Sequence, residues 1–148
     1  MSDDALPFVD EHRVLVAAPA DAVWRALTRR SPRRRPAAAA LVRLLGTEPR
    51  TASGDDLAEG ATIPGFRVAA VDPGRRVRLA GRHRFSRYAL ELTLAEAPDG
   101  TALTARTFAA FPGLRGRAYR RAVIGSGAHR VLVGRLLRGV RRRAEGGR

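Results

Sequence analysis

A regular alternation of apolar and polar residues through the middle of the chain constrains the fold more than any other feature. It covers residues 76–85 and, after a short break, residues 88–95. Two further strands are expected at residues 66–71 and 101–108. The connecting segments contain Asp-Pro-Gly and Pro-Asp-Gly, which are typical of tight turns. Amphipathic strands joined by short turns predict an antiparallel meander with one face buried against the core and one face exposed to solvent.

A strand and two short helices are expected before this meander. The strand covers residues 11–17, which are rich in β-branched side chains. A helix then opens at Pro19, since proline suits a first helical turn and Asp21 favours its positive end. A second short helix is expected at residues 37–45. The polar, glycine-rich stretch 47–63 predicts either a loop or one short edge strand.

The rest of the chain predicts a long helix in two pieces. They cover residues 114–124 and 128–143, and Gly125-Ser126-Gly127 between them should weaken or kink the helix. The second piece carries an apolar stripe at helical spacing: Leu132, Val133, Leu136, Leu137 and Val140. Residues 1–148 are therefore expected to form a single α+β domain, a curved antiparallel sheet that packs around a long C-terminal helix.

Composition limits the kinds of chemistry that the chain can perform. It has no cysteine, so disulfides, thiolate metal sites and a cysteine nucleophile are all excluded. The acidic start has no apolar signal core, and no apolar run approaches the roughly 20 residues of a spanning helix. We therefore expect a cytoplasmic protein.

The net charge is +14, from 28 basic and 14 acidic residues, and every basic residue is arginine. Such an excess attracts nucleic acid, anionic lipid or acidic partners. The abundance of alanine and glycine beside arginine is equally typical of a GC-rich genome. Arginines that alternate with apolar residues along the strands also indicate an ordinary solvated sheet face. Nucleic acid is not expected as a partner, because no aromatic residues interleave the basic clusters 33–35 and 141–143. Membrane contact is expected to be peripheral at most, since the sheet should cover the apolar stripe.

Three segments resemble a known superfamily: VLVAAPADAVWRAL (14–27), PGFRVAAVDPGRRVRLAGRHRFSRYALELTL (64–94) and TARTFAAFPGLRGRAYR (104–120). Together with the order of elements, they resemble the helix-grip fold of the SRPBCC or START-like superfamily, which includes the Bet v 1-like allergens. The likeness is to bacterial members of the polyketide cyclase/dehydrase-like kind. It implies a hydrophobic cavity between the sheet and the C-terminal helix, with no cofactor required.

Aromatic side chains and histidines are the candidate ligand-binding residues in such a fold. They are Trp24, Phe66, His83, Phe85, Tyr88, Phe108, Phe111, Tyr119 and His129. For each residue taken singly the structural role is the favoured interpretation, an aromatic as core and a histidine as a satisfied buried group, and several aromatics around one void would favour binding. His12, near the N-terminus, is expected to be exposed, and Arg84, Arg87 and Arg106 are expected on the surface.

No motif assigns a reaction. The chain has no G-x-S-x-G elbow, no carboxylate pair placed for acid–base work and no histidine spacing typical of a metal site. The favoured hypothesis is a module that binds a small hydrophobic or amphipathic molecule. The alternatives are a cyclase- or dehydratase-like enzyme, with acid–base help from His83, His129 or Tyr119, and an arginine-rich protein that contacts polyanions without a functional cavity. Oligomeric state stays open.

Overall fold

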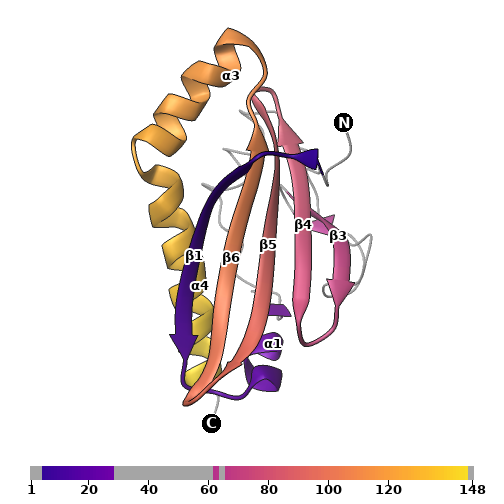
Figure 1. Ribbon diagram of the computed structural model, residues 1–148, viewed down its shortest axis with the longest axis vertical. Helices are drawn as coiled ribbons and strands as arrows, with labels where there is room; N and C mark the ends of the chain where they lie inside the picture. The colour runs from indigo at the N-terminus through magenta and orange to yellow at the C-terminus, as the bar shows by residue number, and fades with distance from the viewer. Residues whose placement is uncertain (1–4, 29–61, 64–65, 147–148) are drawn as a thin grey trace.

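The computed structural model describes residues 5–28, 62–63 and 66–146, and its strands form one antiparallel sheet. The strand order is β1-β6-β5-β4-β3-β2, so the N-terminal strand lies at one edge beside the last strand (Figure 1). The strands are β1 (Phe8–Val16), β2 (Thr62–Ile63), β3 (Phe66–Asp72), β4 (Arg76–His83), β5 (Ser86–Ala97) and β6 (Gly100–Ala110). The predicted meander is confirmed as β3 to β6, with each strand paired to the next.

The helices begin and end close to the predicted positions. They are α1 (Ala20–Thr28), α3 (Gly113–Arg120), a short π-helical segment η2 (Arg121–Gly125) and α4 (Ala128–Gly146). The predicted break between the two C-terminal pieces is confirmed by η2 and by Gly127, whose φ of +81° favours glycine. Helix α4 runs alongside β1 on the rear side of the sheet in Figure 1, and α1 lies near its lower end. This is the predicted α+β helix-grip arrangement.

The main core lies between the sheet and the two helices α1 and α4. We call the side of the sheet that faces them the inner face. Strand residues on this face include Val77, Leu92 and Leu103, all fully buried. Helix α1 contributes Val23 and Ala26, and α4 contributes a narrow stripe: Val133, Leu137, Val140 and Ala144. The sheet and the C-terminal helix are therefore joined by continuous apolar packing, which stabilises the fold by removing apolar area from water.

The predicted apolar stripe of α4 is wrong at two positions. Leu132 is 59% exposed and Leu136 is 37% exposed. Successive helical residues turn by about 100°, and the buried line that starts at Val133 leaves Leu132 roughly a quarter turn away from it. The line continues instead to Ala144.

The opposite side of the sheet, the outer face, carries a second, smaller core and a line of paired charges. Leu6, before β1, packs on Ala80 and Ala89, so the start of the chain crosses this face (Figure 1). Cross-strand register aligns four charged residues over four strands, in the order Arg78, Glu91, Arg106 and Glu11.

The expectation of a fully solvated arginine face is wrong for Arg78. Its side chain contacts the Glu91 carboxylate at 3.4 Å and lies over the Phe108 ring, and it is only 8% exposed. A carboxylate and an aromatic face together compensate the loss of water around a guanidinium.

The turn before β6 brings two backbones close together. Gly100 has a φ of +149°, and a Cβ there would lie 2.0 Å from the Val16 carbonyl oxygen. Glycine is therefore required at this point, where the end of β1 meets the start of β6. The second predicted helix, 37–45, lies outside the described residues, as does most of the stretch 47–63. Its last two residues form the short edge strand β2.

Candidate functional site

Six of the nine candidate residues gather at one end of the inner face. They are Phe66, His83, Phe85, Tyr88, Phe111 and Tyr119, which we call the aromatic cluster. They come from β3, β4, the β4–β5 turn, β5, the segment after β6, and α3. All six are half-buried. The chain has only eight Phe, Tyr and Trp residues, and five of them are here.

Tyr119 is the centre of the aromatic cluster. Its ring centroid lies 4.6 Å from that of His83 in an edge-to-face arrangement and 5.5 Å from that of Phe85 in a stacked one. Tyr88 connects the cluster to Phe66, with ring centroids 5.3 Å apart. Such aromatic pairs stabilise a site beyond simple burial of area.

The backbone of α3 also approaches this group closely. A Cβ on Gly116 would lie 2.6 Å from the Phe111 carbonyl carbon, so glycine is what allows the helix to sit here. Gly116 and Tyr119 are the α3 residues that are not exposed. They therefore make the contacts that hold α3 against the rest of the molecule.

The hydrogen bonds of His83 define its protonation. The Phe85 backbone N–H donates to Nδ1 at 3.0 Å, so Nδ1 is the acceptor nitrogen of the neutral ring. Nε2 then carries the proton and donates to Ser86 Oγ at 2.9 Å. Burial lowers the pKa of His83, which favours this neutral form. Because Nε2 is the donor, His83 does not act as a base toward the Ser86 hydroxyl.

Both tyrosines of the cluster are held as neutral phenols. Burial, reinforced by the nearby Tyr119, raises the pKa of Tyr88 far above its usual value, and burial raises the pKa of Tyr119. The aromatic cluster therefore presents flat apolar surfaces together with uncharged hydrogen-bonding groups. This combination suits a molecule with an apolar ring or chain and a neutral oxygen.

The structure places the other three candidate residues elsewhere. Trp24, on α1, packs against the main core. Phe108 lies on the outer face and makes an edge-to-face contact with Phe8 at 5.9 Å. His129 lies in the first turn of α4 and belongs to a separate polar network. The predicted surface positions of Arg84, Arg87 and Arg106 are confirmed.

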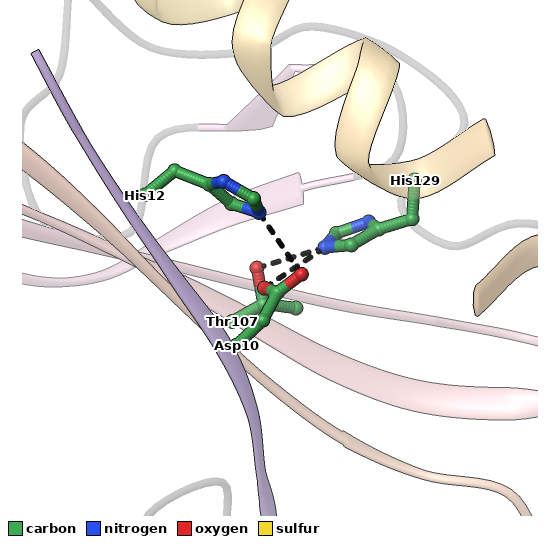
Figure 2. A network of polar contacts seen from close by, with 4 residues as sticks. All are labelled: Asp10, His12, Thr107 and His129. Carbon is green, nitrogen blue, oxygen red and sulfur yellow. Dashed lines mark hydrogen bonds and ion pairs between the residues drawn. The ribbon is translucent and has the colours of Figure 1, made fainter. Parts of the chain in front are cut away.

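The polar network joins β1, β6 and α4 around one carboxylate (Figure 2). His12 Nε2 contacts Asp10 Oδ2 at 3.0 Å. On the other side, His129 Nε2 lies 3.3 Å from Asp10 Oδ1 and 3.1 Å from Thr107 Oγ1. The expectation that His12 is exposed is wrong, because alternation along β1 turns it to the inner face with Asp10.

Asp10 is ionised in this arrangement. Burial by itself raises the pKa of Asp10, but the hydrogen bond from His12 and the charges of His129 and His12 outweigh it, so the pKa is lowered overall. The Asp10 carboxylate accepts from Nε2 of both imidazoles and so orients the two rings around it. The i, i+2 pair Asp10 and His12 on one strand face was visible in the sequence, but its partner on α4 was not.

The aromatic cluster and this network lie on the same face of the sheet. Thr107 of the network and Ala109 are two residues apart on β6, so their side chains lie on the same face. Ala109 is the cross-strand partner of Tyr88. Two residues of a strand span about 7 Å. Thr107 therefore lies one row of side chains away from Tyr88, and Asp10, its partner on β1, lies one strand further from the aromatic cluster.

The described residues give two negative findings. Among them, no three His, Asp or Glu side chains are placed so that they could hold a metal ion. Within the same part of the chain, no helix is both long and apolar enough to cross a membrane.

Comparisons with known proteins support the fold. No family model matches the chain, and a search of curated proteins finds no match. Among solved structures, protein NE0264 from Nitrosomonas europaea is similar over 100% of this chain and 99% of its own, at 16% identity and a TM-score of 0.59. A conserved protein from Geobacillus kaustophilus covers 90% of this chain and 93% of its own, at 14% identity and a TM-score of 0.58. A protein from Rhizobium leguminosarum is similar over 92% and 93%, at 15% identity and a TM-score of 0.57. At these identities the likeness shows the fold alone.

Proposed function

We propose that the protein binds a small amphipathic molecule on the inner face of the sheet, against the aromatic cluster. The observation that carries this proposal is the convergence of five of the eight aromatic residues, with His83, in a group that is only half-buried. Half-burial alone does not distinguish these rings, since Trp24 and Phe108 are half-buried as well; their convergence does, because grouped accessible rings offer a ligand flat apolar contact beside polar groups.

The chemistry of the cluster favours an uncharged ligand with a hydrogen-bonding oxygen. The phenols of Tyr88 and Tyr119 are neutral, and His83 is a neutral ring with its polar atoms engaged by Phe85 and Ser86. Phe66, Phe85 and Phe111 supply the apolar contact. A flat or chain-like hydrophobic molecule with a carbonyl or hydroxyl group fits these properties.

A second candidate, an acid–base enzyme, is favoured by the network around Asp10. Its histidines are oriented by an ionised carboxylate, and His129 lies near the row that leads to Tyr88. Such a pair can move a proton to or from a bound carbonyl compound. The two candidates share one ligand surface and differ in whether the ligand leaves chemically changed.

Titration with the neutral fluorescent probe N-phenyl-1-naphthylamine tests the binding proposal. We expect saturable binding, and a loss of affinity of at least tenfold in Phe85→Ala and in Tyr119→Ala. Phe108→Ala is the matched control, since that ring is also half-buried but lies on the outer face. The proposal fails if the probe binds equally well to the cluster variants, or if Phe108→Ala weakens binding as much.

Native mass spectrometry of protein from its own host separates the binding module from the enzyme. A module retains a co-purified molecule unchanged. For an enzyme, His129→Asn should retain the molecule in one chemical form while the wild-type protein releases another. Identical products from the two proteins would exclude a role for His129 in catalysis.

A further inference from the structure

The C-terminal helices carry most of the unbalanced charge of the described chain. Between Gly113 and Gly146 there are ten arginines and one acidic residue, Glu145. All ten arginines are exposed. The single carboxylate is already engaged, because Glu145 Oε1 accepts from the Ala17 backbone N–H at 2.9 Å and from Arg141 Nε at 3.1 Å.

On the outer face of the sheet, one line of charged residues is paired across the strands. Its arginines alternate with carboxylates along the cross-strand line, with Arg106 Nε 2.6 Å from Glu11 and Arg78 3.4 Å from Glu91. Outside the C-terminal helices the described chain has ten arginines and seven carboxylates, an excess of three, whereas between Gly113 and Gly146 the excess is nine. The asymmetry points to an anionic partner on the helical side.

Exposed aliphatic side chains lie among these arginines. Leu114, in the first turn of α3, is 81% exposed, and Val131 and Leu132 of α4 are 51% and 59% exposed. At 3.6 residues per turn, Val131 lies with Arg138 and Arg142 on the side of α4 opposite its buried stripe, and Leu132 lies beside them. We call these exposed residues of α3 and α4 the basic helical surface.

From this surface we infer that the helical side of the protein docks on an anionic phospholipid membrane. Arginines pair with lipid phosphates while the aliphatic side chains enter the boundary between head groups and acyl chains. A helix of 19 residues, as α4 is, offers about 28 Å of length to lie in the plane of the interface. This inference does not depend on the proposed ligand site.

Nucleic acid fits the same surface less well. Exposed aliphatic side chains gain nothing from a phosphate backbone, whereas they gain from partial burial in lipid. The segment from Gly113 to Gly146 contains no Asn or Gln, which are common partners of base edges. Its aromatic residue, Tyr119, belongs to the aromatic cluster and is not part of the exposed surface.

Vesicle flotation tests the inference. We expect the wild-type protein to float with vesicles of phosphatidylglycerol and phosphatidylcholine, and not with phosphatidylcholine alone. Val131→Ser/Leu132→Ser should lower the partition coefficient at least tenfold at constant charge. Leu15→Ser, at a position 60% exposed on β1, is the matched control and should bind like wild type. Circular dichroism checks that each variant is folded.

Charge is tested separately with Arg135→Gln/Arg138→Gln/Arg142→Gln. This variant should lose at least tenfold in affinity for the anionic vesicles, while Arg75→Gln/Arg76→Gln, changed at the exposed β3–β4 turn, should not. Absence of binding to anionic vesicles overturns the inference, as does unchanged binding by Val131→Ser/Leu132→Ser. Tighter retention on duplex DNA than on vesicles, with a steep salt dependence, overturns it in favour of nucleic acid.

Discussion

At the scale of single residues, His83 shows how local hydrogen bonds decide what a side chain can do. A histidine next to a serine suggests a base and a nucleophile. The Phe85 N–H excludes that arrangement, because it occupies Nδ1 and places the ring proton on Nε2. His83 and Ser86 therefore form a structural pair at the end of the β4–β5 hairpin, where they also orient the neighbouring rings.

The lowered pKa of His83 predicts a dependence of stability on pH. Below the ordinary histidine pKa of 6.5, the unfolded chain takes up a proton that the folded chain resists. The free energy of unfolding should therefore fall as the pH drops below about 6.5, and His83→Gln should remove part of that slope. Urea denaturation between pH 8 and pH 5 measures it, and equal slopes in the two proteins would contradict the assignment.

All six residues of the aromatic cluster were candidates from the sequence, but their grouping could not be predicted from it. Strand parity places His83 and Tyr88 on the inner face, and both were candidates for that reason or for their chemistry. Phe108 has the opposite parity along β6, and sequence alone did not show which parity faces the helices. The Asp10 network was missed because His129 reaches it from 119 residues away in the chain.

At the scale of elements, α4 is held by a narrow line of contacts and not by its full set of apolar residues. The sequence predicted the helix and its break near Gly125. It overstated the buried stripe, since apolar spacing cannot show how wide a strip of the helix the neighbouring elements cover. The strands were predicted within a few residues because alternation and turn residues are both local features.

Two leucines of α4 offer a direct test of that packing. Leu137 is fully packed in the core, so Leu137→Ala should lower the free energy of unfolding by about 2–5 kcal/mol. Leu132→Ala, the same change at the exposed position, should stay within about 0.5 kcal/mol of wild type. Chemical denaturation of both variants measures the difference, and similar losses would mean that Leu132 is part of the core.

At the scale of the whole molecule, hydrogen bonds join the first strand of the described chain to its last helix. Strand β1 contacts α4 through Asp10 and His129, and the segment after β1 contacts it through Ala17 and Glu145. These bonds lie at opposite ends of α4 and fix its position along the edge strand. They therefore hold the helix in register with the face that carries the proposed ligand site.

Removal of the Asp10 charge tests the contact between β1 and α4. Asp10→Asn should lower the free energy of unfolding at pH 7 by about 1–2 kcal/mol, since two imidazoles lose an ionised acceptor. Because the pKa of Asp10 is lowered in the folded protein, the difference from wild type should shrink as the pH falls below about 3.8. Asp21→Asn, at an exposed ion pair, is the control and should change little. A deficit that persists unchanged in acid would rule out an ionic contribution from Asp10.

The pairing of β1 with β6 also sets the order in which the strands can pair during synthesis. Partners such as Val16 and Thr101, or Phe8 and Phe108, lie 85 to 100 residues apart. During synthesis β1 therefore stays without its partner strand until residues Gly100–Ala110, which form β6, have left the ribosome. The hairpins from β3 to β6 are made of neighbours and can assemble meanwhile. Chaperones therefore have a long interval in which they can bind β1 while its backbone hydrogen-bonding groups are unpaired.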